Sequence, residues 1–345
     1  MFFPLYYFFF NVKGGTESII LAIKAHRNYY RDRYSIMHPE IVACVSAHAA
    51  VDKACDIMGL KLKKVPFDPV TFKCDTKALE RAIGPNTIML YSSAPGYPQG
   101  VIDDIVEMGR LATKYNIGLH VDCCLGGFIL PFAKKLGYSI PDFDFSVKGV
   151  SSMSLDTHKY GYALKGSSVV LYRSKELRRA QYFNYPEWTG GIYTTPTIAG
   201  SRSGGLLAQT WASMMAMGES GYMKYTRDIL ETAKLIAQGV KSIQGLTILG
   251  ATEVMIVCFA ADKSVPKPID IYAVGDCMTA RGWCLNTLQH PASIHICCTV
   301  CHVGHHEEFL SDLRSSVEEI RSRPANAKEG KAAVYGMAAS LPRIT

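Results

Sequence analysis

Lys159 is the residue of this 345-residue chain whose surroundings most suggest chemistry. It lies in the stretch SMSLDTHKYGYALKG, between His158 and Tyr160 and among glycines and small polar residues. A long lysine stem normally carries its charge into water, so on its own Lys159 is expected to be a solvated surface charge. A lysine held inside a protein can instead form a covalent bond with a carbonyl compound.

Three further groups stand where predicted strands end or a predicted helix begins. The segment GGTES precedes a helix, so free backbone N–H groups near Gly15 and the hydroxyl of Thr16 can hold a phosphate. His48 follows the strand-like run IVACVSA, and Asp122 ends the run GLHVD. Ligands of open parallel sheets bind beyond the carboxyl ends of the strands. These groups are therefore expected to meet Lys159 at that edge.

A phosphate cradle, an aromatic plate, a carboxylate and a lysine are together what pyridoxal phosphate needs. The lysine forms a Schiff base, and the carboxylate keeps the pyridine nitrogen protonated so that the ring accepts electrons. Each group also has an ordinary explanation, because glycine pairs make turns, and histidines and aspartates cap helices. Their order along the chain and their placement at successive strand ends favour the cofactor site.

Alternating elements predict how these residues are positioned. Apolar spacing and turn residues predict helices at 14–32, 48–59, 75–84 and 102–116. Strands are expected at 40–47, 60–67, 87–94, 117–126, 145–160 and 167–173. This alternation predicts an α/β fold, with a mostly parallel sheet and helices on both of its faces.

The later part of the chain predicts a second, smaller domain. A long helical stretch begins near Gly204, followed by short strands and a last helix at 307–323. We expect a short apolar N-terminal segment at 1–13, a large cofactor-binding domain at 14–240, a small C-terminal α/β domain at 241–323 and a loosely ordered tail at 324–345. The opening run MFFPLYYFFF is too short for a bilayer, which needs about 20 residues. It is expected to be a buried strand or the start of a shortened chain.

The composition excludes few functions, but it indicates the kind of ligand and the cellular compartment. The net charge of +7 is scattered, which gives little support to nucleic-acid binding and suits an anionic ligand. The 11 cysteines show no regular disulfide framework, so a reducing compartment is expected. The segment HICCTVCHVGHH suggests a metal site, but its strand-like alternation favours a structural role and no metal. Trp211, Met214, Met215 and Met217 have helical spacing and are expected in the core.

Several longer motifs carry a family resemblance. They are GGTESI, HAAVDKA, SAPGYPQGVIDDI, HVDCCLGGF, DTHKYGYALKGSSVVLYR and TIAGSRSGG. In this order they resemble the sphingosine-1-phosphate lyases, a family of the pyridoxal-phosphate-dependent group II decarboxylases with the fold-type I architecture. The resemblance runs from about Val12 to near Arg321. It implies the fold-type I transferase fold, with a smaller C-terminal domain.

The resemblance also implies a role for each matching residue. Lys159 matches the Schiff-base lysine, Asp122 the partner of the pyridine nitrogen, and His48 the histidine that stacks on the cofactor ring. The remaining matches are to the phosphate loop (Gly15, Thr16), to a histidine near the cofactor phosphate (His158), to a second lysine that handles substrate (Lys165), and to a loop that approaches the neighbouring subunit's site (Ser201, Arg202). An arginine there suits phosphate recognition.

The implied reaction is a retro-aldol cleavage between C2 and C3 of a phosphorylated sphingoid base. It gives a fatty aldehyde and phosphoethanolamine, and Lys159, Lys165 or His158 moves the protons. Two alternatives stay open. One is a related amino-acid decarboxylase, which SAPGYPQG disfavours. The other is a silent lyase paralogue that serves as a dimer partner.

The family also sets expectations about setting and assembly. It implies a homodimer and attachment at the cytosolic face of the endoplasmic reticulum, while this chain alone is expected to be soluble and cytosolic, shortened at its N-terminus. Two positions depart from the family pattern. NVKGG replaces the usual Thr-Ser-Gly-Gly, and Gln99 replaces a commoner histidine.

Overall fold

The computed structural model describes residues 8–323, which form two compact units. Within the described residues, the first unit runs to Lys224. The second begins at Tyr225 and also takes in Val70–Phe72 and Pro98–Gly100. The expected tail at 324–345 and the first seven residues of the expected N-terminal segment lie outside the described residues.

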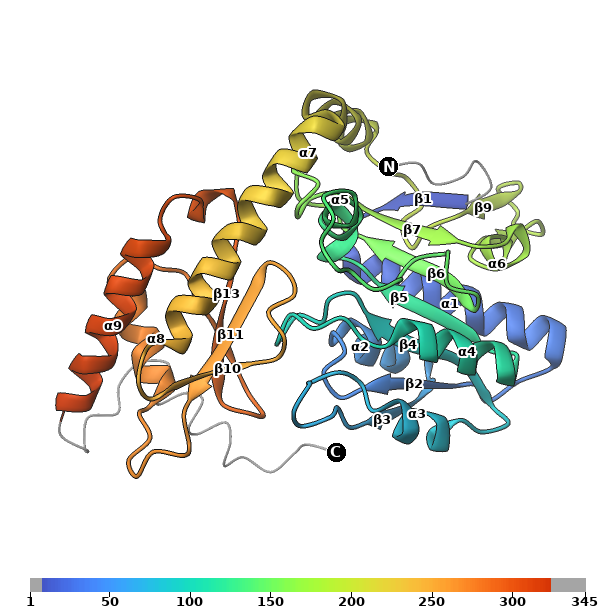
Figure 1. The fold of residues 1–345 in the computed structure, drawn as a ribbon. Coiled ribbons are helices and arrows are strands. Elements are labelled where there is room, and N and C mark those ends of the chain that lie inside the picture. Colours follow the sequence, from blue (N-terminus) through green and yellow to red (C-terminus); the bar gives the residue numbers. More distant parts are fainter. Residues whose placement is uncertain (1–7, 324–345) are drawn as a thin grey trace. The chain divides into compact units, whose positions relative to one another are not determined.

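A mixed sheet forms the centre of the first unit (Figure 1). Its seven strands follow the order β1-β7-β6-β5-β4-β2-β3. Their bounds are Phe8–Val12 (β1), Glu40–Cys44 (β2), Lys61–Val65 (β3), Thr87–Ser93 (β4), Gly118–Asp122 (β5), Val150–Leu155 (β6) and Ser168–Tyr172 (β7). Strands β3, β2, β4, β5 and β6 pair in parallel, whereas β7 pairs antiparallel with both β6 and β1. The predicted mostly parallel sheet is therefore confirmed.

Helices connect these strands and cover the sheet (Figure 1). They are α1 (Gly15–Tyr34), α2 (Ala50–Met58), α3 (Thr76–Ala82), α4 (Ile105–Tyr115), the 3₁₀ turn Gly126–Phe128, α5 (Leu130–Lys135) and α6 (Lys175–Arg179). Asp75 caps α3 by accepting hydrogen bonds from the backbone N–H groups of Lys77 and Ala78. Gly59 ends α2 in a left-handed conformation (φ 61°), which glycine adopts without steric penalty.

The apolar core of this unit lies between the sheet and its helices. Strands β2 and β4 are buried along their whole length. Ile19 and Ile23 of α1 pack in one cluster with Ile41 of β2 and Val51 of α2. Strands buried on both faces are typical of parallel sheets covered by helices. This core holds the ends of the strands at fixed positions.

A hairpin and the first part of a long helix, up to Lys224, complete the first unit, and the rest of this helix belongs to the second. A hairpin of β8 (Phe183–Tyr185) and β9 (Tyr193–Thr195) precedes the long helix α7 (Gly204–Lys241). Gly218 interrupts α7 with non-helical angles (φ 58°, ψ 177°), so α7 consists of two helical segments. The predicted core position of Trp211 and Met215 is wrong for this chain, because their side chains are 66% and 64% exposed. Helical spacing alone does not show which face of a helix is covered.

The second unit contains a four-stranded antiparallel sheet in the order β10-β11-β13-β12. The strands are Leu246–Leu249 (β10), Ile256–Ala261 (β11), Asn286–Leu288 (β12) and Ser293–Cys297 (β13). Its helices are α8 (Ile271–Ala280), the 3₁₀ turn Val300–His302 and α9 (His306–Ser322). Across the described range 8–323, no helix is long and apolar enough to cross a membrane.

Candidate active site

A cavity of about 320 Å³ opens at the carboxyl ends of strands in the first unit. Seven of the nine predicted site residues line it: Gly15, Thr16, His48, Asp122, His158, Lys159 and Lys165. The same wall contains residues that the sequence did not single out: Lys13, Gly14, Ile19, Cys124, Asp156 and Gly166. Segments far apart in the sequence thus meet in one cavity, which is large enough for a small ligand.

The N-terminus of α1 forms one wall of the cavity. Gly14 precedes the helix with φ 96°, a conformation that favours glycine, and it provides no side-chain cap. The first N–H groups of a helix have no partner inside the helix, and the helix dipole adds positive potential there. Lys13, Lys159 and Lys165 line the same cavity. This wall is therefore suited to an anion such as a phosphate.

Glu17 ties the start of α1 to a distant loop. One carboxylate oxygen accepts a hydrogen bond from the backbone N–H of Lys13 (2.6 Å), and the other accepts one from Ile198 (3.1 Å). Ile198 belongs to the loop that leads to Ser201 and Arg202. Glu17 is buried, so these two bonds satisfy a carboxylate that would otherwise be expensive to bury. The phosphate-binding wall and the loop are thus held together.

Asp122, the last residue of β5, is buried, and both of its carboxylate oxygens accept hydrogen bonds. Its Oδ2 accepts a hydrogen bond from the Tyr91 hydroxyl (2.6 Å), and its Oδ1 accepts one from the Cys124 backbone N–H (2.9 Å) and one from Ser154 (3.2 Å). Burial alone would raise the pKa of the carboxyl group. The hydrogen bonds from Cys124 and Tyr91 outweigh burial, so the pKa lies below its usual value. Asp122 therefore stays negatively charged at neutral pH.

His120 supports Asp122 through Ser154. The Ser154 hydroxyl donates to Asp122, so it accepts from Nε2 of His120 (3.2 Å), and Nδ1 of His120 contacts the Ser152 hydroxyl (2.8 Å). Burial lowers the pKa of His120 to about 3. This histidine is therefore neutral at ordinary pH, and it orients the serine without adding charge.

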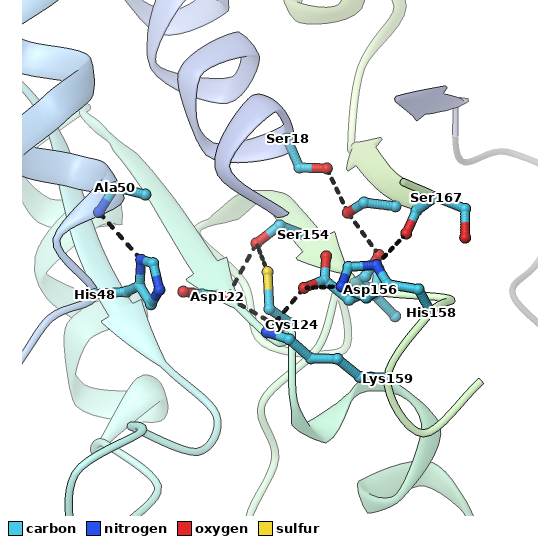
Figure 2. A network of polar contacts seen from close by, with 12 residues as sticks. Ser18, His48, Ala50, Asp122, Cys124, Ser154, Asp156, His158, Lys159 and Ser167 are labelled. Carbon is cyan, nitrogen blue, oxygen red and sulfur yellow. Dashed lines mark hydrogen bonds and ion pairs between the residues drawn. The ribbon is translucent and has the colours of Figure 1, made fainter. Parts of the chain in front are cut away.

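Lys159 points into the cavity from the turn that follows β6. Its ammonium nitrogen lies 2.8 Å from Oδ2 of Asp156, three residues earlier (Figure 2). Burial lowers the pKa of Lys159, but the neighbouring Cys124, Asp156 and Asp122 raise it more, and the pKa lies above its usual value. Burial raises the pKa of the Cys124 thiol well above its usual value, so that thiol is neutral at pH 7. The carboxylates are therefore what keep Lys159 charged.

Two histidines flank this pair. Nδ1 of His158 donates to the backbone carbonyl of Ser167 (2.6 Å), which leaves Nε2 facing Asp156 at 3.8 Å. Nδ1 of His48 accepts a hydrogen bond from the Ala50 backbone N–H (3.1 Å), so the ring proton is on Nε2. Figure 2 shows His48 beside Asp122 and across from Lys159. A planar ligand held between Asp122 and Lys159 would therefore contact the ring of His48.

The other predicted residues differ in their placement. Lys165 is exposed yet lines the cavity, and the backbone N–H of its neighbour Leu164 is held by Gln209 of α7 (2.9 Å). Ser201 and Arg202 are exposed and do not line the cavity of the single chain. Their predicted roles in a neighbouring subunit's site remain predictions. Within residues 8–323, no group of three or more metal-binding side chains is found.

Sequence reasoning missed Asp156, Tyr91 and Cys124. Asp156 stands three residues before Lys159, directly after β6, so a charged residue at a strand end was the available signal. Cys124 follows Asp122 by two residues and has a similar signal. Tyr91 lies inside a continuously buried strand and looks like a core residue. Only pairing of β4 with β5 brings it beside Asp122.

These side chains fit pyridoxal phosphate. The cavity combines a helix N-terminus for the phosphate, an anionic carboxylate for the pyridine nitrogen and a lysine for the aldehyde. A Cβ atom at Gly15 would lie 2.7 Å from both oxygens of Asp156 and 2.8 Å from the Cys124 sulfur, so this wall leaves room for no side chain. The structure thus explains why a glycine begins the helix.

Comparison with known proteins also points to a protein that binds pyridoxal phosphate. Residues 10–262 match the family model described as the pyridoxal-dependent decarboxylase conserved domain. The chain belongs to this family. It is also 49% identical over 329 residues to a sphingosine-1-phosphate lyase of Oryza sativa, covering 95% of this chain and 60% of that protein. The chain thus spans about 60% of the length of this curated relative.

Solved structures of family members show the same fold. A sphingosine-1-phosphate lyase of Burkholderia pseudomallei superimposes with a TM-score of 0.88 at 39% identity, covering 97% of this chain and 73% of that one. A glutamate decarboxylase of Lactobacillus brevis matches with a TM-score of 0.80 at 20% identity, covering 92% and 76%. The second likeness shows the fold alone. Fold-type I architecture, pyridoxal phosphate as cofactor and resemblance to the lyases are therefore confirmed.

Proposed function

We propose that the protein is a pyridoxal-phosphate-dependent aldehyde-lyase acting on phosphorylated sphingoid bases. It would cleave the bond between C2 and C3 by a retro-aldol reaction, giving a fatty aldehyde and phosphoethanolamine. The observation that carries this proposal is the meeting of Lys159, Asp122 and the N-terminus of α1 in one cavity. The identity to lyases over 95% of the chain supports the choice of substrate class.

The cofactor, when bound, supplies an electron-accepting ring for the electron pair left at C2. Around it, the chain's own residues have distinct tasks. Gly15 and Thr16 bind the phosphate through N–H groups at the start of α1. Asp122, which stays anionic, would keep the pyridine nitrogen protonated, and Lys159 would hold the cofactor covalently. His48 would pack against the cofactor ring.

Proton transfer at the C3 hydroxyl needs a base in the same cavity. Lys159, Lys165 and His158 all line it, and each can accept a proton in its neutral form. In His158, Nδ1 is engaged with the Ser167 carbonyl, so Nε2 is the atom available for transfer. A substrate phosphate would add an anion to a chain with net charge +7 and with three lysines at the cavity.

We also propose a homodimer, with Ser201 and Arg202 approaching the partner's cavity. An exposed apolar stripe supports this arrangement. Leu207, Trp211 and Met215 are spaced at i, i+4 and i+8 on the first segment of α7 and are all exposed in the single chain. The adjoining loop ends at Arg202, so a partner covering the stripe would also meet this arginine. Attachment at the endoplasmic reticulum remains a proposal that rests on family resemblance.

The test is an absorption spectrum of the purified chain with pyridoxal phosphate, followed by an assay with sphinganine 1-phosphate. We expect a visible band in the wild type, and after borohydride reduction we expect the cofactor on the peptide that contains Lys159. Lys159→Ala should lose the band and the activity, whereas Lys53→Ala, at an exposed position on α2, should keep both. A wild-type band without aldehyde product would exclude the lyase and favour a decarboxylase or a silent dimer partner. The absence of any band would contradict cofactor binding itself.

A further inference from the structure

Asp156 is a buried carboxylate that the proposed chemistry does not yet use. It is 2% exposed, stands directly after β6 and lines the cavity. Its Oδ2 pairs with the Lys159 ammonium at 2.8 Å. Its Oδ1 is buried and has no hydrogen-bond partner in the described part of the chain. Burying a carboxylate oxygen without a hydrogen-bond partner costs free energy of folding, so a role in the site would explain why Asp156 stands here.

Comparison with Asp103 shows what a structural carboxylate looks like in this fold. Asp103 is also buried, and each of its oxygens accepts a backbone N–H, from Cys74 (2.9 Å) and from Ser93 (2.8 Å). These bonds tie Asp103 to the end of β4 and to the segment before α3, and they leave neither oxygen unsatisfied. Among residues 8–323, Asp156 accepts no such backbone bonds: Oδ2 contacts Lys159 at 2.8 Å and His158 Nε2 at 3.8 Å, and Oδ1 has no partner. Its position is therefore explained by the lysine and the cavity.

The phosphate-binding wall lies against the same carboxylate. A Cβ atom at Gly15 would approach both oxygens of Asp156 to 2.7 Å. The N-terminus of α1 thus faces Asp156, and its dipole favours a negative charge there. The carboxylate lies between the positive end of a helix and a lysine ammonium.

We propose that Asp156 is the counter-ion that holds Lys159 as an ammonium ion, in place and protonated, whenever the lysine is not bound to the cofactor. The inference rests on the proposed function for its purpose, but not for the ion pair itself. Asp156 touches a reacting atom, Nζ of Lys159. It therefore decides how readily that nitrogen becomes a nucleophile, and it gives the released lysine a fixed position.

The chemistry of the lysine shows why this matters. To bind the cofactor, the ammonium must first give its proton to solvent, which frees the nitrogen lone pair. The lone pair forms the bond to the aldehyde carbon, and the aldehyde oxygen leaves as water with the two remaining N–H hydrogens. Asp156 opposes the first step because it favours the charged form. The reverse release of Lys159 by a substrate amine is favoured for the same reason.

The first test measures the lysine in the full chain freed of cofactor. Trace labelling with acetic anhydride between pH 7 and pH 11, read by peptide mass spectrometry, gives the reactivity of Lys159 relative to Lys165. In Asp156→Asn, we expect the profile of Lys159 to move at least one unit toward lower pH, with about tenfold more labelling at pH 8. Superimposable profiles in the wild type and the variant would overturn the proposal.

A matched control is available on the surface. Asp52 and Lys64 form an ion pair of the same 2.8 Å length, partly exposed to solvent. Asp52→Asn makes the same chemical change without touching the cavity. We expect it to leave the labelling of Lys159 unchanged. A shift of Lys159 in Asp52→Asn as large as in Asp156→Asn would show a general charge effect and would also overturn the proposal.

A second pair of variants keeps the proposal testable if Asp156→Asn fails to fold. Lys159→Met leaves the buried carboxylate without its cation, so its melting temperature should fall below that of the wild type. Adding Asp156→Asn removes the stranded charge, and the double variant should melt higher than Lys159→Met alone. A double variant that melts no higher would refute the counter-ion role. None of these readouts needs a bound cofactor, so failure of the proposed function would leave them unchanged.

Discussion

The hydrogen bond from Tyr91 to Asp122 gives a sharp quantitative prediction. Tyr91→Phe removes one hydroxyl oxygen and leaves Oδ2 of the buried carboxylate without this donor, which lies 2.6 Å away. Hydrogen bonds to charged groups contribute about 1.5–3 kcal/mol, so we expect the free energy of unfolding to fall by about 2 kcal/mol. For a unit of this size, the melting temperature should drop by about 6 °C.

The chain contains a matched control for this change. Tyr172 on β7 is also fully buried, but its hydroxyl has no hydrogen-bond partner in the described part of the chain. Tyr172→Phe is the same substitution in the same sheet, and it removes an unsatisfied polar atom. It should leave the melting temperature unchanged or raise it slightly. Equal losses in Tyr91→Phe and Tyr172→Phe would refute the reasoning, because ring packing rather than the bond to Asp122 would then explain both.

The pH dependence of the Tyr91→Phe deficit provides a second check. Asp122 has a folded-state pKa below its unfolded value, so the stability that it contributes is present above the unfolded pKa, near 4. This stability is lost as the pH falls through the folded pKa. Urea unfolding should therefore show the full deficit at pH 7 and a smaller one below about pH 4. A deficit that stays constant at low pH would show that the charge of Asp122 is not involved.

Two further predictions concern acid stability and assembly. Burial lowers the folded-state pKa of His26 to about 4, below its unfolded value, so its stabilising effect is complete above pH 6.5 and falls as the pH drops. The free energy of unfolding, measured with urea, should therefore be about 2 kcal/mol lower at pH 5 than at pH 7 in the wild type, and His26→Gln should lack this decrease. An equal decrease in both proteins would contradict the lowered pKa of His26. Trp211→Glu should weaken self-association by about 30-fold in sedimentation, as expected for an interface hot spot. Ile57→Glu, at another exposed apolar position, should not weaken it, and unchanged association in Trp211→Glu would exclude the stripe as the dimer contact.

Much of the fold and of the cavity could be predicted from the sequence, because the signals were local. Lys159, Asp122 and His48 stand at or just after strand ends, where parallel topology brings side chains to one edge. Gly15 could be predicted for a similar reason, since a Gly-Gly pair before an apolar helical pattern indicates an open helix N-terminus. Their placement at strand ends and at a helix start, combined with parallel topology, was enough to predict that these residues lie together.

What the sequence could not show depends on pairing between distant segments. Tyr91 reaches Asp122 only through the register of β4 against β5, in which Ser93 lies opposite Asp122. The exposure of Trp211 depends on what covers α7, which its helical spacing does not reveal. Asp156 was hidden by proximity to Lys159, because a carboxylate three residues from a lysine usually forms an ordinary surface pair. Its burial gives the pair its importance.

Glu17 has a consequence for linkage between cofactor binding and assembly. Its two oxygens hold the backbone of Lys13, at the phosphate-binding wall, and of Ile198, near the proposed dimer contact. A ligand that orders one of these segments lowers the entropy that the other has still to lose. Thermodynamic reciprocity then applies: whatever the phosphate adds to the affinity between two chains, the second chain adds to the affinity for the phosphate. A single buried carboxylate thus links the phosphate-binding wall to the loop at the proposed dimer contact.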